Sequence, residues 1–133
     1  MSGLEHLFLV PFERSFDAAY GLEYLEPTCG RVHVREALLG ADGTVHSGVY
    51  AAMAESIAST GTAVEVVPQG LFPAGLSNST HVVGEVRDGV LEARARCRAR
   101  GAGEWVWEVE IGPPGGEPAA LATVTIAVRR RTV

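Results

Sequence analysis

Glu55 is the only charged residue between Ser47 and Val64. A carboxylate can attack a carbonyl carbon as a nucleophile, or it can act as a general base that activates water. Burying an ionised carboxylate without a partner is costly, so a lone glutamate in an apolar segment needs an explanation. Two alternatives to catalysis are that Glu55 reaches solvent at an edge, or that it pairs with an arginine of a neighbouring strand or subunit. The residues that precede Glu55 favour catalysis.

The run Gly-Thr-Val-His-Ser-Gly at residues 43–48 leads directly into a predicted helix from Ser47 to about Val67, with Ser47 as its N-cap and Gly48 just inside. The first free backbone N–H groups of this helix point back along its axis. Such a terminus can hold a developing oxyanion, and one well-placed donor contributes about 10²–10³ in rate. His46 is a candidate catalytic residue, although a histidine before a helix is more often a capping or packing residue than a base.

The distance between these two features has a consequence for the site. Glu55 lies about 11 Å along the helix axis from the N-terminus, at 1.5 Å per residue. That separation is too large for one helix to place both groups on a single carbonyl carbon. A second copy of the helix, antiparallel across a dimer axis, would bring Glu55 of one chain beside the Ser47 amide of the other. The sequence therefore predicts a site shared between subunits.

The helix has two distinct faces at 100° per residue. Val49, Met53, Ile57, Thr60 and Val64 lie on one, and Ala51, Glu55, Ser59 and Thr62 on the other. The second face is small and polar but nearly uncharged, whereas a solvent-exposed helix normally carries several charges there. We therefore expect protein to surround this helix on most sides.

The C-terminal half of the chain alternates with period two, which predicts β-strands with one apolar and one charged face. Leu91–Ala99 alternates with arginines, Trp105–Ile111 alternates with glutamates, and Ala120–Arg130 supplies a final strand. Gly101–Gly103 and Gly112–Pro118 are the predicted connections. The arginines and glutamates should pair across the strands on the outer face.

Three shorter elements are predicted before the long helix. Pro11 can open a helix to about Ala19, which Gly21 ends in a left-handed conformation, and strands follow at Leu22–Leu25 and Gly30–Leu38. Together the elements predict an α+β protein, in which a strongly curved antiparallel sheet and one helix bury each other.

Composition limits the function further. The 133 residues are expected to form a single domain, 1–133, with a net charge of −5 that argues against a general nucleic-acid binder. All 11 basic residues are arginine, which excludes a catalytic lysine and a P-loop lysine. Cys29 and Cys97 lack metal-ligand spacing. The apolar run Leu7–Val10 is too short to span a bilayer and follows Glu5 and not a basic segment, so no signal peptide is expected and a cytoplasmic location is.

The run Gly-Thr-Val-His-Ser-Gly-Val-Tyr-Ala-Ala-Met-Ala-Glu-Ser-Ile-Ala-Ser at 43–59 resembles the hotdog thioesterase signature, His-Gly-Gly followed by a small-residue helix that carries Ala-Glu. It is most similar to the PaaI-like branch that contains the 4-hydroxybenzoyl-CoA thioesterase of the Arthrobacter type and the 1,4-dihydroxy-2-naphthoyl-CoA thioesterases. Residues 75–81 (Gly-Leu-Ser-Asn-Ser-Thr-His), 88–89 (Asp-Gly) and 104–107 (Glu-Trp-Val-Trp) also resemble segments of that branch.

The resemblance implies a hotdog fold, with one long central helix wrapped by a five- or six-stranded sheet, paired into homodimers and then homotetramers. It implies hydrolysis of a CoA thioester, with an aromatic acyl group among the candidates and with no metal or redox cofactor. Glu55 would be the nucleophile or general base, the Ser47 amide would polarise the carbonyl, and His46 would line the site. Gly48, Ser59 and Asn78 are the corresponding substrate-binding candidates.

This chain departs from the branch at two positions. Gly40 replaces a Gln or Asn that helps to hold the thioester oxygen, and Gly84-Glu85 replaces an Arg-Pro or Arg-Ser that contacts the nucleotide phosphates. Other arginines could supply phosphate contacts, namely Arg87, Arg100 and Arg129–Arg131.

Two other functions fit the same residues. A hotdog hydratase or dehydratase acting on 2-enoyl thioesters also pairs a histidine with a carboxylate, although the spacing from His46 to Glu55 resembles thioesterases more closely. A non-catalytic acyl-CoA binding module is the third hypothesis, which Gly40 and Gly84 encourage. One scaffold can host all of these functions.

Overall fold

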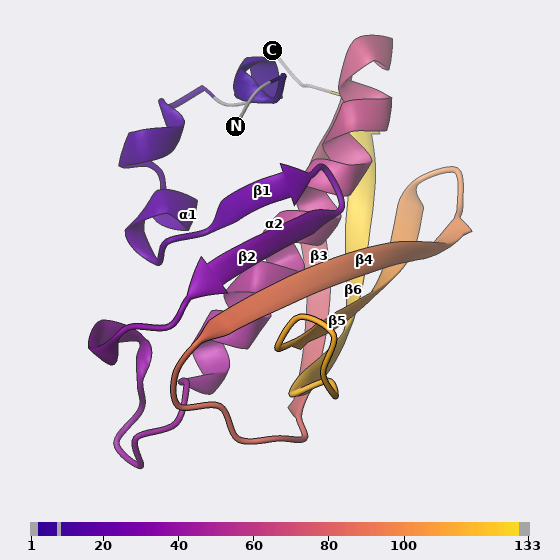
Figure 1. The fold of residues 1–133 in the computed structure, drawn as a ribbon. Helices are drawn as coiled ribbons and strands as arrows, with labels where there is room; N and C mark the ends of the chain where they lie inside the picture. The colour runs from indigo at the N-terminus through magenta and orange to yellow at the C-terminus, as the bar shows by residue number, and fades with distance from the viewer. Residues whose placement is uncertain (1–2, 8, 131–133) are drawn as a thin grey trace.

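The computed structural model describes residues 3–7 and 9–130, in which one long helix, α2 (Ser47–Val66), packs against a six-stranded sheet (Figure 1). The strand order is β1-β2-β4-β5-β6-β3, and every neighbouring pair is antiparallel. The strands are β1 (Glu23–Glu26), β2 (Cys29–His33), β3 (Leu71–Val82), β4 (Val90–Arg100), β5 (Glu104–Gly112) and β6 (Ala120–Arg130). The short helices are α1 (Phe16–Ala19) and the 3₁₀ turns η1 (Glu5–Leu7), η2 (Phe12–Arg14), η3 (Glu36–Leu38) and η4 (Val67–Gln69).

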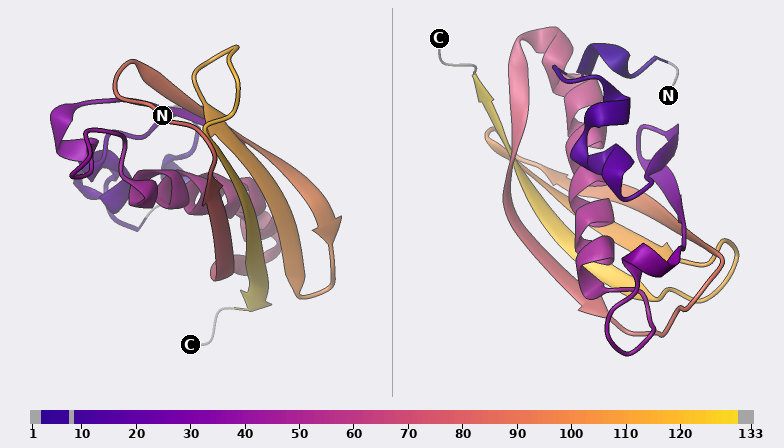
Figure 2. Two further views of the ribbon diagram at one scale, coloured as in Figure 1. Left: turned by 90° about the horizontal axis from the view of Figure 1, so that it is seen from below. Right: turned by 90° about the vertical axis from the view of Figure 1, so that its left-hand side faces the viewer.

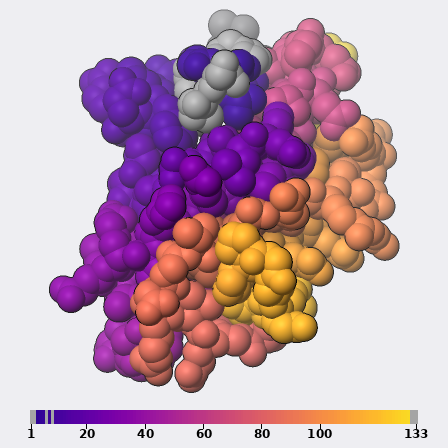
Figure 3. Space-filling view, viewed as in Figure 1, coloured from indigo at the N-terminus to yellow at the C-terminus, as the bar shows by residue number. Residues whose placement is uncertain are grey.

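The sheet curves around α2, which lies on its concave side (Figure 2, left). Seen from the outer face of the sheet, β1, β2 and β4 pass in front of the middle of the helix, and their side chains hide it in the space-filling view (Figures 1 and 3). The predicted α+β, hotdog arrangement is therefore confirmed. No helix in the described ranges is long and apolar enough to cross a membrane.

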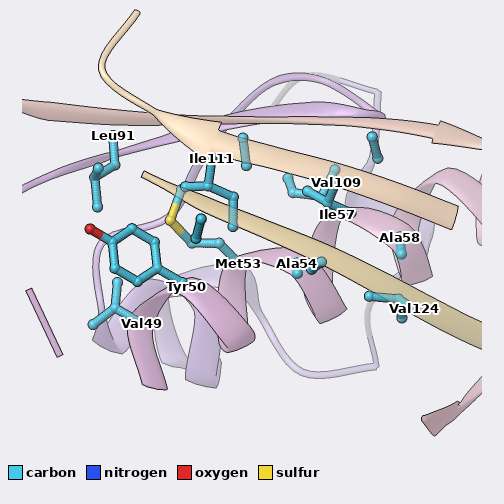
Figure 4. Close-up of a cluster of buried hydrophobic side chains, with 14 of the residues drawn as sticks. Val49, Tyr50, Met53, Ala54, Ile57, Ala58, Leu91, Val109, Ile111 and Val124 are labelled. Atoms are coloured by element: carbon cyan, nitrogen blue, oxygen red, sulfur yellow. The ribbon is translucent and has the colours of Figure 1, made fainter. Parts of the chain in front are cut away.

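The core forms where the apolar face of α2 meets the inner face of the sheet (Figure 4). Met53, Ile57 and Tyr50 are at most 1% exposed, as are Val109 and Ile111 on β5. Burying an aliphatic side chain of this size contributes about 1.5–3 kcal/mol. The period-two pattern of β5 is confirmed throughout, because the two tryptophans of this strand are buried as well.

Thr62 lies on the small polar face predicted for the helix and is completely buried, as expected for a helix that protein surrounds. Its hydroxyl donates to the carbonyl of Ala58 at 2.9 Å and accepts a hydrogen bond from the indole Nε1 of Trp107, also at 2.9 Å. The last two turns of α2 are thus covered on this face, because Trp107 reaches across from β5.

Thr62→Val should lower the free energy of unfolding by about 1–3 kcal/mol, because it leaves the buried indole N–H of Trp107 without an acceptor. Chemical denaturation measures the difference. Thr123→Val on the exposed face of β6 is the control and should change stability by at most about 0.5 kcal/mol. Equal stability of the Thr62→Val variant and the wild type would show that this hydrogen bond contributes nothing.

The outer face of the sheet departs from the predicted charge ladder. A register shift between Cys97 and Ala99 interrupts the alternation of β4, so Ala99 is exposed instead of buried. Beyond the shift Arg100 turns toward the helix, where it pairs with Glu65 at 2.6 Å and lies over the Trp105 ring at 4.6 Å.

The charge pairs that remain on this face are mostly not the expected ones. Arg98 and Glu108 make a cross-strand pair at 3.6 Å, whereas Arg94 pairs with Glu92 of its own strand at 3.0 Å. These groups are exposed or partly exposed, so each pair contributes little to stability.

Two N-terminal elements are shorter than predicted. The helix expected from Pro11 to Ala19 is divided at Ser15, whose extended backbone and side chain cap α1 by accepting a hydrogen bond from the Ala18 amide at 3.3 Å. Gly21 has the predicted left-handed conformation, with φ of +87°. The strand predicted over Gly30–Leu38 ends at His33, because its partner β4 begins at the paired residue Val90.

Candidate active site

The N-terminus of α2 is capped by His46 and not, as predicted, by Ser47. His46 has extended backbone angles, with φ of −60° and ψ of 136°, and its Nδ1 accepts a hydrogen bond from the Gly48 amide at 2.8 Å. An imidazole that accepts at Nδ1 carries its ring proton on Nε2. The Gly48 N–H is therefore already hydrogen-bonded to the cap. The N–H of Ser47 has no hydrogen-bond partner in the described part of the chain.

The loop before the helix fixes this corner. Gly43 adopts a left-handed conformation with φ of +82°, which closes a turn in which the Asp42 carboxylate accepts hydrogen bonds from the amide and hydroxyl of Thr44 at 2.9 and 2.7 Å. These hydrogen bonds lower the pKa of Asp42 from its usual value. Val45 and His46 then donate backbone hydrogen bonds to Val86 and Leu38. The helix start is thereby attached to two other parts of the fold.

Glu55 lies two turns further along α2, partly buried at the open edge of the sheet. Its carboxylate rests against Gly75 of β3 so closely that a Cβ at position 75 would overlap Glu55 Oε2. The ladder between β3 and β6 slips between Gly75 and Ser77, which is a β-bulge. Close by, the side-chain amide of Asn78 donates to the carbonyl of Ala51 at 2.9 Å and attaches β3 to the helix.

The alternatives for Glu55 can now be compared with the geometry. Within the described ranges no arginine pairs with Glu55, so an ion pair inside the chain does not explain it. Glu55 is only partly buried at the sheet edge, which agrees with the other alternative to catalysis, a glutamate that reaches solvent at an edge.

The helix is also less enclosed than predicted within one chain. Ser47 and Gly48 are exposed, and Ala51, Ala52 and Glu55 are only partly buried. The sheet ends at β3 on one side of the helix and the N-terminal segments lie on the other (Figure 2, right). This uncovered strip of α2, from Ser47 to Glu55, we call the open face.

Ser59 lies one turn beyond Glu55 and is partly buried, but no hydrogen bond joins them in the structure. A neighbouring polar cluster was not predicted. The Ser56 hydroxyl donates to the Asp17 carboxylate at 2.6 Å, the Tyr20 hydroxyl lies 3.3 Å from both groups, and the Tyr24 hydroxyl contacts Thr60 at 2.7 Å. Burial raises the pKa of both tyrosines. No sequence signal marks this cluster, because its members come from distant segments.

The remaining predicted residues divide into engaged and free groups. Arg87 donates to the Asp42 carbonyl at 3.1 Å and lies 3.6 Å from Glu85, while Arg100 is held by Glu65. Arg129 and Arg130 are exposed, and Arg131 lies outside the described residues. Gly84 packs on Ala119, where a Cβ would meet its Cα at 3.4 Å. Arg87 is thus the arginine beside the 43–48 corner, and it is already bound there.

The model of the thioesterase superfamily matches residues 42–120, which include both the helix start and Glu55. The chain belongs to the thioesterase superfamily. A relative from Mycobacterium tuberculosis, the candidate esterase Rv1847, is 35% identical over 102 residues, covering 72% of this chain and 73% of the relative. A candidate esterase from Deinococcus radiodurans is 37% identical over 87 residues, covering 65% of this chain but only 54% of its own length.

Solved structures agree with this superfamily assignment. The structure of Rv1847 superposes with a TM-score of 0.83 at 30% identity, covering 89% of this chain and 98% of the other. AziG of S. sahachiroi gives a TM-score of 0.82 at 28% identity, covering 88% and 98%. A protein of Bacillus halodurans solved with CoA shares the fold at 19% identity and a TM-score of 0.77, over 84% of this chain and 74% of that one.

Proposed function

We propose that this thioesterase-superfamily protein hydrolyses acyl-CoA thioesters to a free acid and CoA, without a metal or redox cofactor. One observation carries the proposal: the open face of α2 presents a backbone donor at Ser47 and a carboxylate at Glu55, neither of which pairs with any described residue. A donor for an oxyanion and a base or nucleophile are the two groups that thioester hydrolysis requires.

The proposed reaction follows from these groups. The Ser47 N–H donates to the thioester carbonyl oxygen, and the helix N-terminus stabilises the negative charge that builds there. Glu55 either attacks the carbonyl carbon, giving an anhydride that water hydrolyses, or removes a proton from an attacking water. In both routes the C–S bond breaks, its electron pair leaves with sulfur, and the sulfur takes up a proton to become the CoA thiol.

The proposed site needs two chains, because Ser47 and Glu55 are about 11–12 Å apart along one helix axis. We propose a homodimer in which the open faces of two antiparallel α2 helices meet, so that Glu55 of one protomer lies beside Ser47 of its partner. The open edge of β3 supports this arrangement, since Leu76, Val82 and Val83 are 46–62% exposed there. An uncovered, apolar strand edge is a surface that proteins normally protect by pairing. Pairing of these dimers into a homotetramer is a further expectation of the family resemblance.

A panel of CoA thioesters tests the proposed reaction, with release of the free thiol as the readout. Aromatic acyl-CoAs belong in the panel with acetyl and medium-chain ones, because the resemblance to the aroyl-CoA branch favours them. We expect turnover of at least one class. Conversion of crotonyl-CoA to 3-hydroxybutyryl-CoA would replace the proposal by a hydratase, and tight binding without any product would replace it by a binding module.

Gly40→Gln should raise kcat for the best thioester by about three- to tenfold, the contribution of one added hydrogen bond. Gly40 does not have a left-handed conformation, and a Cβ there would lie 3.8 Å from the His46 ring in ordinary contact. We expect a glutamine amide at this position, next to the N-cap residue His46, to donate to the carbonyl oxygen held by Ser47. Gly40→Leu, which adds bulk without a donor, is the control and should give no increase. A Gly40→Gln variant with unchanged kcat would show that the missing amide does not limit this chain.

Gly75→Ala should lower kcat by about 10–100-fold, because its methyl group displaces the Glu55 carboxylate. The carboxylate is the mobile end of a long side chain, so the fold itself should keep its stability. Gly103→Ala is the matched control, since nothing lies within 4 Å of a Cβ at that position. Equal kcat for the two variants would mean that the close contact with Gly75 does not position Glu55.

A further inference from the structure

A pocket of about 240 Å³ opens beside the first turns of α2. The N-terminal helix α1 forms one wall, the turn η3 and the residue after it form another, and α2 closes the third side. The lining residues are Phe16, Tyr20, Ala37, Leu38, Leu39, His46, Gly48, Val49 and Ala52.

The lining determines what the pocket can hold. Among the described residues no Asp, Glu or Arg lines it, and its polar groups are Tyr20 and the His46–Gly48 corner at the helix start. The pocket therefore begins at His46 and Gly48, the residues on either side of Ser47, and its other lining is mostly apolar. Phe16 at its rim is 70% exposed, which is unusual for a phenylalanine that contacts no ligand.

Tyr20 is the most firmly held part of the lining. It is 7% exposed, and its hydroxyl is hydrogen-bonded to the Asp17 carboxylate and to Ser56 of α2. Two partners that are themselves joined at 2.6 Å fix the orientation of this ring. Phe16, by contrast, meets the Tyr20 ring at a centroid distance of 5.3 Å without any polar anchor. The tyrosine thus forms a hydrogen-bonded wall of the pocket, and the exposed phenylalanine lies at its rim.

We propose that this pocket receives the acyl group of the thioester and that Tyr20 is the residue that limits its size. This inference rests on the hydrolase function proposed above. An apolar cavity of about 150 Å³ accepts a benzene molecule, so about 240 Å³ accommodates one ring with a short arm, or a linear acyl group of roughly six to eight carbons. The substrate class is therefore an uncharged, apolar acyl group of medium size. Acids with a second carboxylate would leave that charge unpaired among apolar side chains.

The test is the profile of kcat/KM over acetyl-, butyryl-, hexanoyl-, octanoyl-, dodecanoyl-, benzoyl- and succinyl-CoA. For the wild type we expect a rise of about fourfold for each methylene that enters the pocket, and a fall of at least tenfold from octanoyl to dodecanoyl. Tyr20→Ala should move the maximum to a longer chain and raise the dodecanoyl to hexanoyl ratio at least tenfold. Tyr20→Phe keeps the ring and should keep the wild-type profile. Succinyl-CoA should be the poorest substrate of its length.

Tyr24→Ala controls for general destabilisation, because Tyr24 has similar hydrogen bonds to α2 but does not line the pocket. It should lower stability without moving the profile. Hydrolysis with the same chain-length ratio in Tyr20→Ala and wild type would overturn the pocket assignment and leave the proposed function intact. If no thioester is hydrolysed, calorimetry can test the pocket by itself, with non-hydrolysable hexanoyl- and dodecanoyl-CoA thioethers as ligands. An equal ratio of the two affinities in Tyr20→Ala and in the wild type would then overturn the pocket assignment.

Discussion

Glu55→Gln should lower kcat for the best CoA thioester by about 10³-fold, while KM changes by no more than a few-fold. The substitution keeps the size of the side chain and its contact with Gly75, but an amide can neither accept a proton from water nor attack as a carboxylate does. Loss of a general base costs about 10²–10⁴ in rate, and the donor at Ser47 still stabilises the oxyanion in the variant. Steady-state thiol release measures both constants.

Glu65→Gln supplies the matched control, because it removes the other carboxylate of the same helix. Glu65 pairs with Arg100 at the opposite end of α2 and has no part in the proposed reaction. Its variant should keep kcat within about twofold and lose at most a small amount of stability, since the pair is partly exposed. Unchanged turnover in Glu55→Gln, or equal losses in both variants, would remove Glu55 from the mechanism.

Ser47→Pro should lower kcat/KM by about 10²–10³-fold, because it deletes the single backbone N–H that we assign to the carbonyl oxygen. The helix should tolerate the change. Ser47 is the first residue of α2, a position that proline favours, and its N–H makes no hydrogen bond in the described structure. The residue before a proline must be extended, and His46 already has ψ of 136°.

Ser47→Ala separates the amide from the side chain. It keeps the backbone donor and removes only the hydroxyl, so its kcat/KM should stay within about threefold of the wild type. Circular dichroism and thermal unfolding of both variants establish that the helix still forms. If Ser47→Pro were folded and as active as Ser47→Ala, the oxyanion donor would have to be another group.

Local patterns were sufficient to predict the main elements. The helix expected over Ser47–Val67 is observed over Ser47–Val66, and the final strand has the predicted limits of Ala120 and Arg130. In both segments the apolar residues recur with one consistent period, and glycine or proline lies close to the ends. The periodicity and the turn residues therefore predict the same element. The helix face that carries Glu55 could be predicted for the same reason, but its partial exposure could not, since protein was expected to surround the helix on most sides.

Contacts between distant segments could not be predicted from those patterns. The N-cap was also predicted wrongly: serine is a common N-cap, but the exposed His46 ring accepts from the Gly48 amide instead. The burial of Thr62 depends on Trp107, which is 45 residues away. The register shift after Cys97 leaves no mark on the alternating sequence, although it sends Arg100 to the helix.

The central claim is that each active site combines the Ser47 amide of one protomer with Glu55 of its partner, and mixed dimers test it most directly. Chains that carry Glu55→Ala and Ser47→Pro, given different affinity tags, are co-expressed, and dimers that contain one of each are isolated. In such a dimer one of the two sites has both groups intact, so about half of the wild-type activity per dimer should return. Activity no greater than that of the two inactive parents would contradict the claim and would place both groups of each site in a single chain.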